Sequence, residues 1–407
     1  MNELRARVIS QEKGIYKIQS GTAVDAYDGM CFFGGLVFFA PVALLVRTQA
    51  GISEGQFFLL QVLLSAVIAL GELPTGYLTD RIGYRSSLIL SQLLLLTARG
   101  ALLAAYLFRS LPLFVLEAVI EGISACLSSG TGSAYLYAAY GKGDYLPKTA
   151  HAANFGTAGF LLSTASYALI YHRFGLKGLL IATVLSGAAG FICALLLRRD
   201  SCVSIKAAGR TERAGLSQLL LLLRDRRARQ FTVLMSLFSV AWLLVNFFYA
   251  EILVQCGIPL AWLSAIIIGY SLAQMLAEPL IHLLGQCAKQ KLTIFFCLLS
   301  GAVLVGFGLL HKPWVLILMM AFLPLFLDLA AFYVEEQQNH LIDTLKMESD
   351  RAAALSVMNM GVNLVEILSL FASSLLVAAG IGWCFGLCGA VLILSAVLCR
   401  RKSGDSF

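Results

Sequence analysis

Residues 76–85 read GYLTDRIGYR, a run of glycines and charged residues between two long apolar stretches. Gly83 can adopt a turn conformation that other residues resist, and Gly76 allows two helices to approach closely. Asp80 can pair with a neighbouring arginine or interact with the N-terminus of a helix, where negative charge is favourable. The run therefore predicts a tight, charged turn between two antiparallel helices, with its arginines at the lipid headgroups.

The composition around this run indicates what kind of protein carries it. Of the 407 residues, 59% are apolar and only 13% are charged, against roughly 25% charged residues in ordinary soluble domains. So few charged groups could not cover the surface of a soluble fold. The same composition excludes intrinsic disorder, a disulfide-stapled secreted fold and a nucleic-acid-binding domain. The chain is therefore expected to cross a membrane many times.

The apolar residues fall into stretches of the length that a bilayer requires. A membrane-spanning helix needs about 20 apolar residues, and twelve such stretches are present. The first six are expected at residues 25–47, 54–78, 87–108, 112–139, 150–171 and 176–197. The second six are expected at residues 230–252, 259–284, 291–310, 313–336, 353–378 and 381–399.

One long polar stretch, residues 198–229, divides these helices into two sets of six. We therefore predict an all-α membrane protein whose twelve transmembrane helices form two six-helix bundles, residues 1–197 and residues 230–407. The polar stretch is a cytoplasmic connector, and the second bundle ends in a short tail. A shift of 206 residues places Glu72 on Glu278, and parallel repeats of this kind predict bundles related by pseudo-two-fold symmetry.

Lysine and arginine residues predict the orientation. With the N-terminus inside, only five of the 30 lie in outer loops, which places both termini and the connector in the cytoplasm. The five are Arg47, Arg109, Arg173, Lys177 and Lys312. The net charge of +7 is then a topology signal, and no nucleic-acid partner is expected. The first 23 residues are polar and mixed in charge, so no cleavable signal sequence is expected.

No pattern in the chain indicates an enzyme, a metal site or a cofactor. The ten cysteines are scattered and the five histidines are dispersed. The sequence contains neither a His-Glu-x-x-His metal helix nor a phosphate-binding glycine loop. We therefore expect no catalytic residues, no metal and no cofactor.

The run at residues 76–85 resembles the signature loop between helices two and three of the major facilitator superfamily, Gly-x-x-x-Asp-Arg-x-Gly-x-Arg. The preceding residues 72–76 (ELPTG), with Ser129, Gly130 and Tyr137, are similar to a bacterial, multidrug-efflux-like branch. The resemblance implies a monomeric secondary transporter in the bacterial cytoplasmic membrane, with a small molecule and protons as partners. It also implies a conformational latch that stabilises one of two global arrangements. The latch residues are Gly76, Asp80, Arg81, Gly83, Arg85 and Glu72.

Three acidic residues at membrane depth are candidates for substrate binding or proton coupling. They are Glu121, Asp328 and Glu366, in the fourth, tenth and eleventh predicted helices. Such residues are costly and usually face the interior of a bundle, where burial disfavours the ionised form of a carboxyl group. A hydrogen-bonded packing role is the alternative. In the superfamily that the sequence resembles, helices one, four, seven and ten line the cavity, which favours Glu121 and Asp328.

For each of the other polar residues the sequence allows two roles. Arg99, the only basic residue at mid-depth in the predicted helices, is expected to pair with a glutamate of helix two or four, with a coupling role as the alternative. Asp25 and Asp28 could cap the first helix or gate its cytoplasmic mouth; we predict a cap for Asp25 and leave Asp28 open. On the seventh helix, Asn246 and Trp242 are candidate cavity residues, with packing as the alternative.

Together these features predict the export of a small amphipathic or cationic compound coupled to protons. The reason is that the deep positions hold several acids but a single arginine. A proton-coupled uptake symporter for a polar nutrient is the alternative, and a polytopic membrane enzyme is a distant third.

Overall fold

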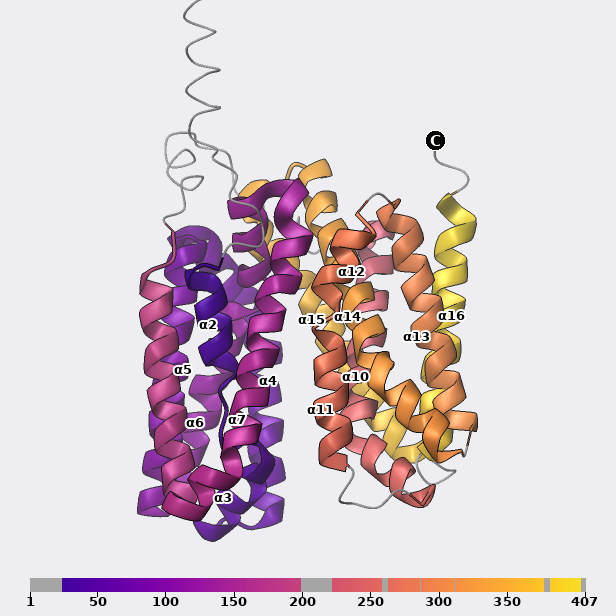
Figure 1. Ribbon diagram of the computed structural model, residues 1–407. Helices are drawn as coiled ribbons and strands as arrows, with labels where there is room; N and C mark the ends of the chain where they lie inside the picture. The colour runs from indigo at the N-terminus through magenta and orange to yellow at the C-terminus, as the bar shows by residue number, and fades with distance from the viewer. Residues whose placement is uncertain are drawn as a thin grey trace, which may run out of the picture.

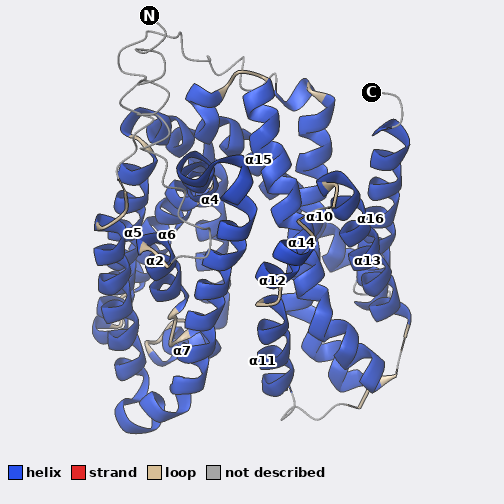
Figure 2. Ribbon diagram, turned by 45° about the horizontal axis from the view of Figure 1, so that its top comes forward, coloured by secondary structure: helices blue, strands red, loops and turns tan. Residues whose placement is uncertain are grey.

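The computed structural model of the chain describes residues 24–198, 222–257, 263–285, 287–310, 312–376 and 381–403. Within these ranges the protein is helical and contains no strand (Figure 2). The helices of the first half are α2 (Ala26–Gly35), α3 (Ala43–Gln49), α4 (Glu54–Ile82), α5 (Tyr84–Phe108), α6 (Leu111–Ser128) and α7 (Thr131–Leu195), with a 3-10 turn η1 (Ala40–Val42). Those of the second half are α10 (Arg226–Gln255), α11 (Leu263–Gln274), α12 (Ala277–Leu283), α13 (Lys289–Leu309), α14 (Pro313–Thr344), α15 (Arg351–Leu376) and α16 (Ile381–Ser403), with 3-10 turns η2 (Leu222–Arg224) and η4 (Glu348–Asp350).

The observed helices follow the predicted stretches, with breaks inside some of them. The first predicted helix is interrupted, because α2 ends at Gly35 and helical structure resumes only at Ala40. The long helix α7 covers the end of the fourth predicted helix, the whole of the fifth and the sixth up to Leu195. Its backbone leaves helical geometry at Gly141 (φ 69°) and Gly175 (φ 62°), where the chain turns between neighbouring spans.

Seven helices among the described residues are long and apolar enough to cross a membrane. They include α13 and α14. The protein is thus a multi-pass membrane protein by length and composition of its helices. The full set of twelve spans, the domain limits at residues 197 and 230 and the cytoplasmic placement of the termini stay predictions.

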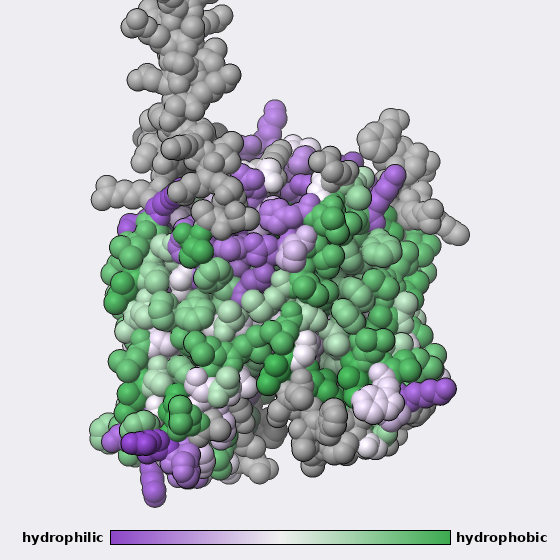
Figure 3. Space-filling view, viewed as in Figure 1, coloured by the Kyte–Doolittle hydropathy of each residue, from purple (hydrophilic) through white to green (hydrophobic). Residues whose placement is uncertain are grey.

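The helices of the two halves gather side by side (Figure 1). The start of α2 and the end of α16 lie at the same end of the helices, which we call the termini side (Figure 1). On the face shown in Figure 3 apolar side chains cover the middle of the molecule, and hydrophilic side chains collect towards the two ends, most of them at the termini side. This distribution is the one expected of helices that cross a bilayer.

Glycines bring pairs of helices into close contact. A Cβ atom at Gly35 of α2 would overlap the carbonyl of Gly156 on α7, and one at Gly308 of α13 would overlap the carbonyl of Gly382 on α16. Small residues drive helix association in membranes, where apolar side chains gain little by leaving lipid. These contacts hold α2 against the middle of α7, which positions the polar residues described below.

Side chains at the helix ends explain where several helices begin. Asp25 accepts hydrogen bonds from the backbone N–H groups of Tyr27 and Asp28, and the Asp28 carboxylate accepts one from the backbone N–H of Asp25. This reciprocal cap confirms the prediction that Asp25 caps the first helix. Ser53 and Gln56 form the same arrangement at the start of α4.

Candidate functional site

The two halves are joined at the termini side by hydrogen bonds to Asp80, in the last turn of α4. The two oxygens of Asp80 accept hydrogen bonds from the backbone N–H groups of Ala352 (3.1 Å) and Ala353 (2.8 Å). These N–H groups belong to the first turn of α15, which has no helical partners for them. A carboxylate in this position satisfies the donors and is favoured by the helix dipole.

The other latch residues fall into two groups. Gly76 faces α15 directly, because a Cβ atom there would lie 2.9 Å from Ala353 Cα. Glu72 is 2% exposed and faces Ser129 of its own half and Ser356 of the other. Both residues therefore lie at the junction between the halves.

Two latch residues shape the turn within the first half instead. Arg85 donates hydrogen bonds to the carbonyls of Leu195 (2.7 Å) and Leu197 (2.8 Å), at the end of α7. Gly83 has a φ of 90° and separates α4 from α5. Arg81 is exposed. The turn is thus held in place by one half while it reaches into the other.

Further polar contacts join the halves near the latch. Tyr137 donates to Asp343 (2.8 Å), and Asn339 donates to Ser133 (2.8 Å). Arg351 pairs with Asp343 and lies over the ring of Tyr137, 4.5 Å from its centroid. Tyr137, singled out by its sequence context, is therefore a contact residue between the halves.

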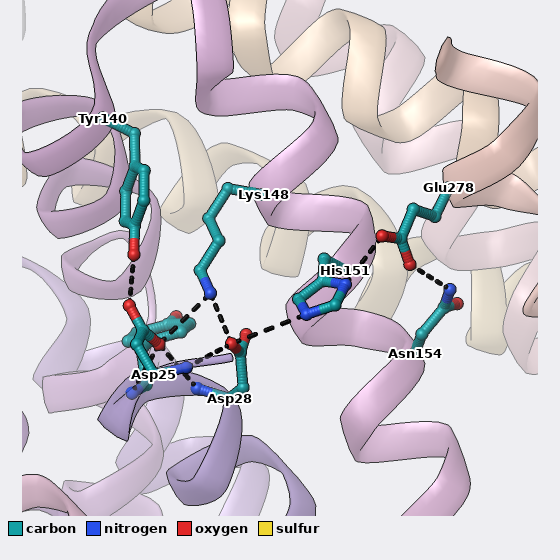
Figure 4. A network of polar contacts seen from close by, with 8 residues as sticks. Asp25, Asp28, Tyr140, Lys148, His151, Asn154 and Glu278 are labelled. Atoms are coloured by element: carbon teal, nitrogen blue, oxygen red, sulfur yellow. Dashed lines mark hydrogen bonds and ion pairs between the residues drawn. The ribbon is translucent and has the colours of Figure 1, made fainter. Parts of the chain in front are cut away.

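A buried network lies deeper, where α2 meets α7 (Figure 4). The Nζ atom of Lys148 lies 2.5 Å from Asp28 Oδ2 and 3.2 Å from Asp25 Oδ1. The side chains of Lys148 and Asp28 are fully buried. Tyr140 donates its hydroxyl hydrogen to Asp25. Asp28, whose role the sequence left open, therefore completes the helix cap and also neutralises a buried lysine.

This network continues across the junction to α12 (Figure 4). His151 Nδ1 lies 2.6 Å from Glu278 Oε1, and Asn154 donates to Glu278 Oε2 at 2.9 Å. The carboxylate of Glu278 is thus contacted at both oxygens by side chains of the other half. Asp28, Lys148, His151, Asn154 and Glu278 form one chain of polar contacts, which we call the α7 network.

The deep acids lie in separate places. Asp328 of α14 accepts a hydrogen bond from Gln274 of α11 (2.8 Å) and lies next to Trp242. Glu366 of α15 is half-buried and faces Ser239. Glu121 of α6 is half-buried and lies beside Glu117. The three acids therefore do not form one site, and the side chain of Asn246 lies outside the described residues.

Two basic residues have surroundings that the sequence did not indicate. The guanidinium of Arg99 donates to Gly34 O (2.9 Å), Thr183 O (3.3 Å) and Ser186 Oγ (3.0 Å). These acceptors lie where α2 ends and its carbonyls lose their helical partners. Glu121, in the fourth predicted helix, interacts with Arg99 electrostatically, without a direct ion pair among the described residues. Arg47, predicted in an outer loop, is 5% exposed in α3 and pairs with Glu117 at 3.1 Å.

The α7 network was missed because its members look ordinary in the sequence. The predicted fifth helix began at residue 150, which left Lys148 in a cytoplasmic loop, and His151 was one of five dispersed histidines. One signal was available. Lys148, His151 and Phe155 are spaced three and four residues apart, which places them on one face of a helix.

Comparisons with known proteins agree with this fold. A family model described as Major Facilitator Superfamily matches residues 29–335. No curated protein matches the sequence.

Solved structures resemble the chain over nearly its whole length. The E. coli fucose:proton symporter FucP matches with a TM-score of 0.74 at 14% identity, covering 92% of this chain and 97% of that one. The human organic anion transporter MFSD10 (TETRAN) matches with a TM-score of 0.71 at 13% identity, covering 92% and 97%. The proton:xylose symporter XylE matches with a TM-score of 0.68 at 16% identity, covering 92% and 94%. At these identities the likeness shows a shared fold.

Proposed function

The chain belongs to the Major Facilitator Superfamily, and we propose that it is a proton-coupled symporter that takes up a polar small molecule by alternating access. The observation that carries this proposal is the position of the contacts between the halves. The hydrogen bonds identified between described residues of the two halves lie at the termini side, on α4, α7, α12, α14 and α15 and at Ser129 and Met275 beside these helices. Two bundles fastened at one end can separate there and close at the other.

The latch would stabilise the arrangement in which the termini side is closed. Asp80 on the α15 N-terminus and Glu72 between the halves are contacts that must break when that side opens. If the termini are cytoplasmic, as the distribution of lysine and arginine predicts, the structure corresponds to an outward-facing state.

The charges at membrane depth support a polar substrate rather than a greasy cation. The prediction of cation export rested on several deep acids and a single arginine. The structure adds two buried basic residues, Lys148 (0% exposed) and Arg47 (5% exposed), so both signs of charge occur inside the helical layer. Polar groups of both halves, among them Asn154 and Gln274, provide donors and acceptors of the kind that orient a polar solute.

Proton coupling is supported by Asp328, for which the described residues provide no cationic partner. The Asp328 carboxyl group is contacted by the uncharged side chains Gln274 and Trp242. A carboxyl group in such surroundings is a candidate for binding and releasing a proton during transport. The two symporters named above couple protons to sugars, which is a property of those proteins and a support for the same coupling here.

The experiment is transport into proteoliposomes with an imposed pH gradient, screened over neutral sugars, carboxylates and organic cations. We expect an inside-alkaline gradient to drive accumulation of one polar solute, and Asp328→Asn to remove the dependence on the gradient. Glu348→Gln, at an exposed acid of η4, is the matched control and should transport like the wild type. Proton-driven extrusion of several unrelated cations would establish export instead, and transport indifferent to pH would refute proton coupling.

A further inference from the structure

The inference concerns His151, which stands between carboxylates of the two halves (Figure 4). Its Nδ1 atom lies 2.6 Å from Glu278 Oε1 on α12, and its Nε2 atom lies 3.7 Å from Asp28 Oδ2 on α2. The imidazole side chain is only 12% exposed, and that of Glu278 only 18%. His151 is thus a short bridge across the junction, with one ring nitrogen directed to each half.

The geometry favours a ring that carries two hydrogens. Because an ionised carboxylate can only accept, the ring's contact with Glu278 requires a hydrogen on Nδ1. Among the described residues Nε2 has no hydrogen-bond partner, although it is buried and faces Asp28. In a neutral imidazole with its hydrogen on Nδ1, Nε2 would direct a bare lone pair at a carboxylate oxygen. An imidazolium instead directs an N–H group at each carboxylate.

The surrounding charges act in the same direction. The α7 network and its neighbour Asp25 bring three carboxylates, Asp25, Asp28 and Glu278, around one ammonium group, that of Lys148. A protonated His151 reduces this excess of negative charge. In a buried site, where charges are weakly screened, such an excess attracts a proton.

The acids of α14, which also packs against α7, have other partners. Glu335 faces Ser133 and Tyr145, and Asp328 is held by Gln274. Neither is among the contacts of His151. The charge state of the bridge is therefore decided by α2, α7 and α12.

We propose that His151 is the proton-binding residue of the termini-side gate: its proton joins Asp28 to Glu278 while that side is closed, and the proton leaves when the side opens. Opening moves α12 away from α7, so the imidazolium loses Glu278 and keeps only Asp28, which Lys148 already neutralises. Its affinity for the proton then falls. The proton passes from the ring to water on the side that has opened, and His151 becomes neutral.

This inference rests on the proposed proton-coupled transport and adds, besides Asp328, a second proton-binding residue at the termini side. A proton picked up in the outward-facing state and released at the termini side would move inward with the substrate. The sequence repeat adds a second support. Glu278 occupies the position that corresponds to Glu72, and each glutamate contacts the opposite half. Glu72 meets serines, whereas Glu278 meets the imidazole ring of His151.

The test measures the gate without any substrate. Amide hydrogen exchange of residues 148–156 and of α12 is followed by mass spectrometry, with the full-length protein in lipid nanodiscs at pD 5.5 and pD 8.0. After correction for the intrinsic pH dependence of exchange, we expect these segments to exchange about tenfold or more faster at pD 8.0. A single proton changes the ratio of closed to open protein by at most about tenfold per pH unit.

Two variants and one control make the outcome decisive. His151→Gln keeps a donor for Glu278 but binds no proton, and Glu278→Gln removes the charge partner, so each should abolish the pH difference. His172→Gln, at an exposed histidine of the same helix, should retain it. A pH difference that survives in either bridge variant, or its absence from the wild type, overturns the proposal. Failure of the transport screen leaves this exchange result intact and would count against the proposed function alone.

Discussion

Replacing Asp80 by asparagine tests whether the latch stabilises the closed termini side. The carboxylate accepts two hydrogen bonds from the α15 N-terminus, at 2.8 Å and 3.1 Å. Hydrogen bonds to charged groups contribute about 1.5–3 kcal/mol each, and neutral ones about 0.5–1.5 kcal/mol. Asparagine has one acceptor oxygen and no charge, so one bond is lost and the other is weakened. The expected loss is about 2–4 kcal/mol, or roughly a 30- to 700-fold shift towards the open arrangement.

The shift can be measured as hydrogen exchange in the first two turns of α15, whose amides face Asp80 when the latch is closed. In Asp80→Asn these amides should exchange faster by a factor within that range. Asp144→Asn provides the control, because Asp144 takes part in none of the hydrogen bonds between described residues. Exchange at α15 that is equal in Asp80→Asn and the wild type would refute the view that this contact stabilises the closed state.

Three further changes follow from single contacts. Gly76→Val should weaken the closed state, because its Cβ would meet Ala353 Cα at 2.9 Å, and cross-linking across this junction should fall. Glu117→Gln should lower the melting temperature, because it breaks the buried ion pair with Arg47 and such a loss costs about 3–5 kcal/mol. A double variant that also carries Arg47→Met should recover most of the lost thermal stability. A double variant as unstable as Glu117→Gln would contradict the pairing. Lys148→Met should destabilise the fold, because it leaves the buried carboxylate of Asp28 without its ammonium partner. Adding Asp28→Asn to this variant should restore thermal stability if the contact between the two residues is the cause.

The helices and the latch turn could be predicted because they depend on local patterns. Long apolar runs indicate spans whatever their neighbours are, since every backbone polar group must be satisfied inside the lipid. For Asp80 the sequence allowed either a neighbouring arginine or a helix N-terminus, and its carboxylate accepts hydrogen bonds from a helix N-terminus. The partner helix, more than 270 residues later in the chain, could not be inferred from the turn itself.

The partners of the deep charges could not be predicted in the same way. Arg99 was expected to pair with a glutamate, yet its hydrogen bonds go to the carbonyl of Gly34 at the end of α2 and to Thr183 and Ser186 of α7. Arg47 was placed in an outer loop, although a 3-10 turn and α3 fold it back against Glu117. In both cases an interruption of the first predicted helix, invisible to hydropathy, changed the environment.

The sequence by itself determined a membrane protein of many helices, with a charged turn at residues 76–85 that resembles a transporter family. These features follow from composition and spacing, which act along the chain. Only the tertiary structure decided that Lys148 is buried, that it meets Asp28, and that His151 and Glu278 bridge the halves. Those contacts arise because close packing of α2, α7 and α12 brings distant residues to the same depth, where a buried charge needs a partner. No single segment carries that information.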